Sequence, residues 1–157
     1  MDLKKREIVI YAVIIIFGLL AAEHLNVVIS GSMEPVLYRG DIVGIEKTDF
    51  LGLHEFDPND VKVGDIVVYN GKWFPGPIIH RVISINETNG EKTFTIKGDN
   101  KFTNPVPDPY PVKPEQIVAR VITIENHPFI IPKIGYITIY IKGFFYQLLG
   151  INEDYRL

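Results

Sequence analysis

The sequence predicts a mostly β domain, built as a small barrel or sandwich, that follows one apolar helix at the N-terminus. Three observations support this fold class. The 157 residues are enough for one domain with a buried core. The 13 glycines and 11 prolines interrupt the chain often, which favours many short strands over long helices. The longest uncharged run, residues 8–22, lies near the start and ends at Glu23 and His24.

Three cations at positions 4–6 precede the apolar run at residues 8–22. As a helix it would measure about 22 Å, short of a hydrocarbon core of roughly 30 Å. A removable signal peptide needs small residues at its last and third-last positions, and Leu20 is a poor match there. A buried core helix would not usually follow three cations. We therefore expect residues 1–24 to be an uncleaved, single-pass anchor in the cell membrane with a cytoplasmic N-terminus, and residues 25–157 to lie on the outer face or its lumenal equivalent.

A serine on a tight bend follows the expected anchor. The apolar run at residues 27–29 stops at Ser30 and Gly31, presents Ser32 and is closed by Pro35. Glycine permits backbone conformations that are closed to other residues, and proline fixes its own φ. Such a bend could expose the hydroxyl of Ser32, although Gly, Ser and Pro also form ordinary strand connections.

Further strands are expected where β-branched and aromatic residues cluster between turn-forming residues. They cover residues 42–46, 65–69, 78–86, 93–97, 116–124 and 134–141. The turn at Asn89 and Gly90 predicts a hairpin between the third and fourth of these strands. Asp41 and Asp65 both follow a glycine and are interpreted as turn formers.

Three segments are expected to lack strand structure. Residues 48–63 show no sustained period and predict a loop, in which His54 is interpreted as a solvated histidine rather than a ligand. Trp73 and Phe74 form an apolar tip that would either cap the core or insert at the lipid interface. Residues 142–150 could form a short amphipathic helix on the core or on the bilayer surface.

Composition excludes several classes of function. The formal net charge is -3 and the lysines do not cluster beyond the N-terminus, so a nucleic-acid partner is not expected. The chain has no cysteine, which excludes disulfides, thiolate metal sites and the thiol nucleophiles of sortase-like or papain-like enzymes. No metal or other cofactor is expected.

Four short motifs, taken in order, resemble the boxes of the type I signal peptidases, the membrane-bound serine endopeptidases that remove signal peptides from secreted preproteins. They are SGSMEP at residues 30–35, IHRV at residues 79–82, GDN at residues 98–100 followed by Asp108, and PEQIV at residues 114–118. The bacterial branch has a lysine before the arginine of the second box, whereas this chain has His80. The chain therefore resembles the archaeal and endoplasmic-reticulum branch, which is Sec11-like. The resemblance implies the signal-peptidase-like, or LexA-like, β fold.

The resemblance implies a role for each motif residue in a Ser-His-Asp arrangement. Ser32 is the expected nucleophile and His80 the general base, a role that suits an imidazole because it titrates near neutrality. Asp108 or Asp99 would orient the imidazole, and the family pattern favours Asp108. The backbone N–H of Ser32 and the hydroxyl of Ser30 are the expected oxyanion donors.

The resemblance also implies the substrate, a signal peptide with small uncharged residues at the first and third positions before the cut. An extended peptide can bind along an exposed strand edge. Val28, Ile29, Ser30 and Ile78 are the residues that we expect to form the walls of this groove. Secretory preproteins and membrane lipid are the expected partners, and the sequence identifies no partner subunit.

Two other interpretations remain open. The chain could be a non-enzymatic, membrane-anchored β module for assembly or ligand binding, in which the Ser32 bend and the proline-rich loop are plain connections. It could also be a serine peptidase with a lysine base, Lys97 or Lys101, and a different substrate.

Overall fold

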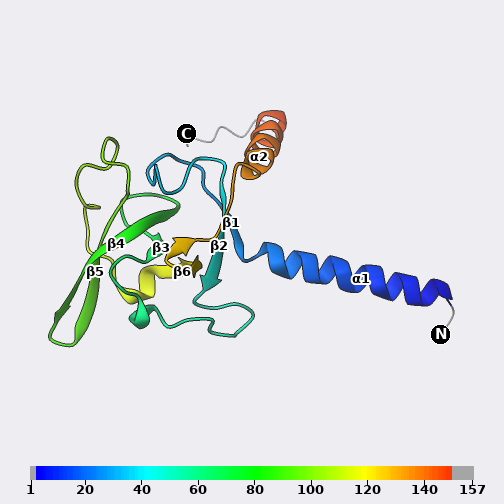
Figure 1. The fold of residues 1–157 in the computed structure, drawn as a ribbon, viewed down its shortest axis with the longest axis horizontal. Helices are drawn as coiled ribbons and strands as arrows, with labels where there is room; N and C mark the ends of the chain where they lie inside the picture. Colours follow the sequence, from blue (N-terminus) through cyan, green and yellow to red (C-terminus); the bar gives the residue numbers. More distant parts are fainter. Residues whose placement is uncertain (1–2, 150–157) are drawn as a thin grey trace.

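The computed structural model describes residues 3–149 as a β body with a helix at each end (Figure 1). The strands are β1 (Leu25–Val27), β2 (Ile42–Lys47), β3 (Ile66–Asn70), β4 (Pro77–Thr88), β5 (Glu91–Lys97), β6 (Ile117–Val121), β7 (Thr123–Ile124), β8 (His127–Pro128) and β9 (Ile130–Ile131). The helices are α1 (Leu3–Ala22) and α2 (Gly135–Leu149), and the single-turn 3-10 helices are η1 (Pro58–Asp60) and η2 (Pro114–Gln116). The predicted mostly β fold is confirmed.

Seven strands form one antiparallel sheet in the order β1-β2-β6-β3-β4-β5, with β9 beside β2. The short strands β7 and β8 form a separate hairpin. In the β4–β5 pair, Arg81 lies opposite Lys97. Because Lys97 is the last residue of β5, the acidic motif at residues 98–100 leaves the sheet beside His80, which precedes Arg81. The sheet thus brings two of the predicted motifs to one end.

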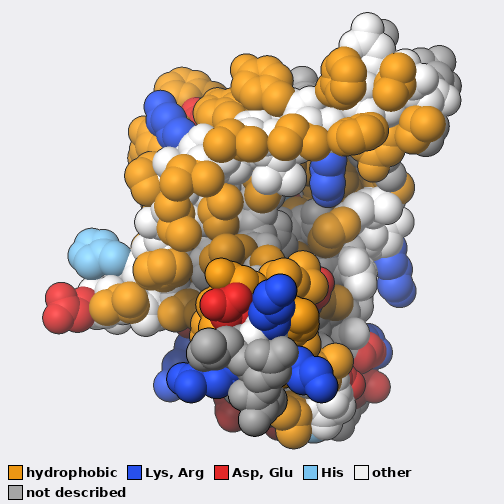
Figure 2. Space-filling view, turned by 90° about the vertical axis from the view of Figure 1, so that its right-hand side faces the viewer, with side chains coloured by type: hydrophobic (Ala, Val, Ile, Leu, Met, Phe, Trp, Pro, Cys, Tyr) orange, Lys and Arg blue, Asp and Glu red, His pale blue; other side chains and the backbone are white. Residues whose placement is uncertain are grey.

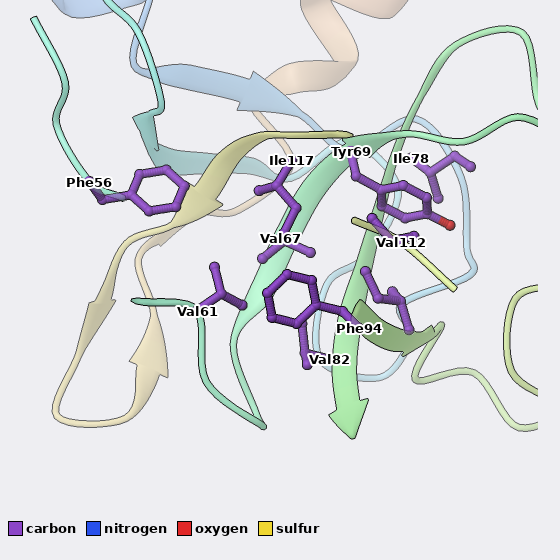
Figure 3. Close-up of a cluster of buried hydrophobic side chains, with 10 residues drawn as sticks. Phe56, Val61, Val67, Tyr69, Ile78, Val82, Phe94, Val112 and Ile117 are labelled. Atoms are coloured by element: carbon purple, nitrogen blue, oxygen red, sulfur yellow. The ribbon is translucent and has the colours of Figure 1, made fainter. Parts of the chain in front are cut away.

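Two clusters of buried side chains fill the core. The first, drawn in Figure 3, contains Phe56, Val61, Val67, Tyr69, Ile78, Val82, Phe94, Ile96, Val112 and Ile117. The second contains Val28, Met33, Leu37, Val43, Ile45, Ile66, Val68, Ala119 and Val121. Alternate residues of β3 belong to different clusters because successive side chains of a strand point to opposite faces. The sheet is therefore buried on both faces at β3.

The bend that carries Ser32 is held by its own apolar side chains. Met33 and Leu37 are both fully buried in the second cluster. Burial of a side chain of this size stabilises a fold by about 1.5–3 kcal/mol. The bend therefore has a fixed position on the sheet, although Ser30 and Ser32 themselves remain accessible to solvent.

The predicted strand at residues 134–141 is wrong, because residues 135–141 form the first half of α2 and residue 134 lies in the turn before it. The run of Ile, Tyr and Thr favours a strand by propensity, but a strand needs a neighbour that bonds its backbone. Helix α2 points away from the sheet (Figure 1), and its residues Ile137 and Tyr140 are exposed. A helix satisfies its own backbone groups and can form there without a partner. The helix predicted at residues 142–150 is confirmed as far as Leu149, and its last residue lies outside the described residues.

The strands predicted at residues 42–46, 65–69, 78–86 and 93–97 form as β2 to β5, with bounds that shift by one or two residues. The strand predicted at residues 116–124 is interrupted after Val121, and its end pairs with β8 instead. Of the apolar run at residues 27–29, Val27 ends β1, and Val28 continues the pairing through two hydrogen bonds of 2.8 Å with the turn at Gly40 and Asp41. The hairpin between β4 and β5 is confirmed, together with its turn.

Both predicted turn aspartates are confirmed in that role. The side chain of Asp41 accepts the N–H of Tyr38 at 2.8 Å, and that of Asp65 accepts the N–H of Lys62 at 3.0 Å. His54 is exposed and its Nδ1 lies 2.7 Å from the carbonyl oxygen of Thr48, as expected for a solvated loop histidine.

The N-terminal helix is confirmed, since α1 covers the expected apolar run. It projects from the β body as a single rod (Figure 1), and every residue from position 4 to position 22 is exposed. Over residues 3–149, no helix combines the length and the apolarity that crossing a bilayer requires. The single-pass anchor stays a prediction.

Candidate active site

A buried histidine and a buried aspartate form a pair at the end of the sheet. Nδ1 of His80, in β4, lies 2.8 Å from Oδ2 of Asp108, and the two side chains are 4% and 3% exposed. The backbone N–H of Asp108 donates to the carbonyl of Ile96 in β5 at 2.9 Å, which fixes the loop that carries the carboxylate. Because a carboxylate accepts, Nδ1 of His80 is the donor, and Nε2 of the neutral ring carries the free lone pair. That lone pair is what a general base needs.

A tyrosine that the motifs did not indicate supports this pair. The hydroxyl of Tyr69 in β3 donates to the same Oδ2 of Asp108 at 2.7 Å. Burial and this hydrogen bond raise the pKa of Tyr69 well above its usual range, so the phenol remains a donor at every physiological pH. The sequence signal that could have found this residue is a tyrosine directly after the apolar residues 66–68 of a strand. If such a tyrosine is buried, its hydroxyl needs a hydrogen-bond partner.

The second candidate acid, Asp99, is held by an arginine instead. Nε and Nη2 of Arg81 donate to the two oxygens of Asp99 at 2.8 and 2.7 Å, and Nη1 donates to the carbonyl of Gly64 at 2.7 Å. The hydrogen bonds with Asp99 raise the pKa of Arg81. The structure therefore places Asp108 on His80 and Asp99 on Arg81, an arrangement consistent with the preference for Asp108. The catalytic role of either residue stays a prediction.

The acidic motif packs directly against the serine bend. The backbone N–H of Asn100 donates to the carbonyl of Ser32 at 2.9 Å, and its side chain donates to the carbonyl of Gly31 at 2.8 Å. A Cβ added to Gly98 would come within 2.6 Å of the carbonyl oxygen of Ser32, so only glycine allows this approach. Because residues 98–100 leave the sheet beside His80, these contacts bring the bend to the same end of the sheet.

The two serines of the bend face each other. Oγ of Ser30 lies 3.3 Å from Oγ of Ser32; Ser30 is exposed and Ser32 is partly exposed. Within the part of the chain that the structure describes, no hydrogen bond joins Ser32 to the imidazole of His80. Catalytic contacts of this kind are often loose before substrate binds. The geometry thus supplies an accessible hydroxyl and an oriented imidazole at one end of the sheet.

The residues predicted to line the substrate groove lie in two environments. Val28 and Ile78 are buried, one in each core cluster, while Ile29 is 49% exposed and Ser30 is exposed. Ile29 and Ser30 are thus the members of this set that a ligand can reach with least rearrangement. Their role in substrate binding stays a prediction.

The chain is similar to named proteins over most of its length, although no family model matches it. It is 37% identical to the signal peptidase complex catalytic subunit SEC11 of Lachancea thermotolerans, over 80% of this chain and 70% of that protein. It is 34% identical to the SEC11 subunit of Scheffersomyces stipitis, over 85% and 78% of the two chains. The chain belongs to the SEC11 family of signal peptidases. The resemblance found in the four motifs is thus confirmed, and so is the expected enzyme class, a signal peptidase, against the non-enzymatic interpretation. An uncharacterized protein of Methanocaldococcus jannaschii is also similar, at 34% identity over 80% of this chain and 87% of that protein.

Proposed function

We propose that this chain is a membrane-bound serine endopeptidase that removes signal peptides from secretory preproteins by a Ser-His-Asp mechanism. The observation that carries the proposal is the buried pair of His80 and Asp108, which lies at the same end of the sheet as the accessible hydroxyl of Ser32. Family membership supports the reaction class, and this pair supports the mechanism.

In this mechanism, Oγ of Ser32 attacks the scissile carbonyl carbon while Nε2 of His80 takes the serine proton. The tetrahedral oxyanion accepts hydrogen bonds from the N–H of Ser32 and the hydroxyl of Ser30. His80 then returns the proton to the leaving amine, and the acyl group stays on Ser32. Water attacks the ester by the same base catalysis, which releases the signal peptide and restores the serine. Asp108 stabilises the imidazolium in both halves, and Tyr69 holds Asp108 in place.

Open backbone edges support the proposed peptide groove. Residues 77–80 of β4 pair with β3 on one side only, because pairing with β5 begins at Arg81. In the described chain, the backbone groups of Ile29 and Ser30 make no hydrogen bond to other backbone groups. An extended signal peptide could therefore add as a strand to these edges, with its small side chains at the first and third positions before the cut directed at the body.

The exposed apolar surface supports attachment to a membrane through α1, and the three cations at positions 4–6 support a cytoplasmic N-terminus. The apolar part of α1 is exposed along its whole length, including Phe17 at 73%, and water is a poor solvent for such a surface. Figure 2, which faces the side from which α1 projects, shows hydrophobic side chains spread over the upper part of the molecule. The exposed apolar residues of α2, such as Phe144, add to this surface.

Cleavage of a purified preprotein in detergent tests the proposal. Ser32→Ala and His80→Ala should each lower kcat by about 10³-fold or more, without a change in unfolding midpoint that accounts for the loss. Lys101→Ala is the matched control, and it should cleave at the wild-type rate. Undiminished cleavage by Ser32→Ala would refute the proposal. Activity retained by His80→Ala and lost by Lys101→Ala or Lys97→Ala would favour a serine peptidase with a lysine base.

A further inference from the structure

A charged cluster that the proposed reaction does not use lies where α1 meets the β body. His24 follows the last turn of α1, and its Nδ1 lies 3.1 Å from the carbonyl oxygen of Leu20 in that turn. Its Nε2 contacts Oε1 of Glu55, in the loop after β2. The ring of His24 also packs edge-to-face on Phe50, with the ring centroids 4.6 Å apart. One side chain thus bridges the helix and the loop.

The partners of His24 require its charged form. The carbonyl oxygen of Leu20 can only accept, and so can the carboxylate of Glu55. A neutral imidazole has one N–H and could satisfy only one of them, whereas an imidazolium donates to both. The position beyond the C-terminal turn of a helix also favours a cation. Consistent with this geometry, the hydrogen bond to Glu55 raises the pKa of His24.

The other charged groups around His24 tie the bridge to the sheet. Oε2 of Glu55 accepts the backbone N–H of Lys47 in β2 at 2.5 Å. Nζ of Lys47 pairs with Glu23 at 2.6 Å and lies 5.4 Å from the ring centroid of Phe50. Glu23, Lys47 and Glu55 are therefore the charged side chains that face His24 from the helix end, from β2 and from the loop. Lys47 is a cation near His24, but its ammonium is paired with Glu23.

This junction decides the direction of α1. Every residue from position 4 to position 22 is exposed, and Figure 1 shows the helix projecting from the body. Over the described residues, the contacts that orient the helix are those at its C-terminal end. Without the His24 bridge, the helix end would keep the Lys47–Glu23 pair and the hydrogen bond from the N–H of Ile45 to the carbonyl of His24, and the direction of the helix relative to the catalytic sheet would be less fixed.

We propose that His24, as an imidazolium, is a positioning residue that fixes the direction of α1 relative to the catalytic sheet by joining Leu20 to Glu55. The consequence for catalysis rests on the proposed function. A preprotein held in the bilayer reaches Ser32 only when the domain faces the membrane at the right angle, so the bridge raises its effective concentration at the site. A short soluble peptide approaches from any direction and does not depend on this angle.

A distance measurement tests the bridge without relying on activity. The chain contains no cysteine, so two spin labels can be placed at Phe17→Cys and Glu87→Cys, both exposed positions in α1 and at the far end of β4. We expect a narrow distance distribution at about pH 5.5 and a broader one at about pH 9, because a rise in pH through the raised pKa of His24 removes one of the two donors of the bridge. The His24→Gln variant should give a broad distance distribution at both pH values. The His24→Arg variant, which carries a permanent cation, should give a narrow distribution at both. His127→Gln, in an exposed β8 position, is the matched control and should follow the wild type. A narrow distribution for His24→Gln at both pH values would overturn the proposal.

A ratio of two cleavage rates tests the catalytic consequence. The rate on a preprotein in lipid vesicles is divided by the rate on a soluble peptide at the same pH, which cancels the pH dependence that the chemical step shares between the two substrates. The wild-type ratio should fall about threefold from about pH 5.5 to about pH 9, since partly exposed ion pairs are modest in strength. His24→Gln should give the low ratio throughout, and His24→Arg the high ratio throughout. Equal ratios for His24→Gln and the wild type at low pH would overturn this consequence. Failure of the wild type to cleave either substrate would instead refute the proposed function and leave the distance measurement valid.

Discussion

Replacing each candidate aspartate by asparagine is the sharpest test of which one orients His80. In Asp108→Asn, the group that faces Nδ1 of His80 loses its charge. If its NH₂ faces the ring, the imidazole must hold its proton on Nε2 and cannot accept the proton of Ser32. Loss of the orienting carboxylate of such a triad lowers kcat by about 10²–10⁴-fold, or about 3–5 kcal/mol of barrier. We expect a loss in that range for Asp108→Asn, with KM little changed.

Asp99→Asn is the matched control, because it removes an aspartate from the same motif region. It breaks the ion pair with Arg81, whose side chains are 28% and 18% exposed, but leaves the bond from Arg81 to Gly64. A partly exposed pair of this kind contributes about 1 kcal/mol to stability. We expect a small decrease in the free energy of unfolding and less than about a tenfold loss of kcat/KM. Preprotein cleavage in detergent and urea unfolding measure the two quantities. A loss of kcat in Asp99→Asn as large as in Asp108→Asn would refute the assignment.

Three further predictions concern the support of the site and the helix junction. Tyr69→Phe keeps the packed ring but removes one donor from the buried carboxylate, so urea unfolding should show about 1.5–3 kcal/mol less stability, with a smaller kcat loss than Asp108→Asn. Gly98→Ala should displace the serine bend and lower kcat/KM, whereas Gly76→Ala, where an added Cβ meets only ordinary contacts, should keep wild-type kinetics. Because the folded-state pKa of His24 is raised, its contribution to stability is fully present below about pH 6.5 and is lost as the pH rises through the folded-state value. Urea unfolding against pH should show this loss in the wild type and a flatter curve in Glu55→Gln.

The parts of the fold that depend on local sequence could be predicted. The strands β2 to β5 follow from clusters of β-branched residues, and the β4–β5 hairpin follows from Asn89 and Gly90, which both adopt the positive φ that such a turn requires. Motif order indicated Ser32, His80 and the two candidate aspartates. These signals are local, and they do not depend on what lies opposite a segment in space.

The remaining features depend on contacts between distant segments. Residues 134–141 have strand propensity, but within residues 3–149 no strand pairs with them, and a helix satisfies their backbone groups without a partner. The hydrogen bond from Tyr69 to Asp108 joins residues 39 positions apart, and the bridge from His24 to Glu55 joins residues 31 positions apart. No periodicity or turn signal reports contacts of that kind.

The distance between Oγ of Ser32 and Nε2 of His80 in an experimentally determined structure with a bound signal-peptide analogue tests the central claim most directly. We expect these atoms to lie within about 3.2 Å of each other, with the peptide extended along residues 77–80 and Asp108 still on Nδ1. A peptide bound elsewhere, with Ser32 and His80 facing separate surfaces, would contradict the proposed mechanism.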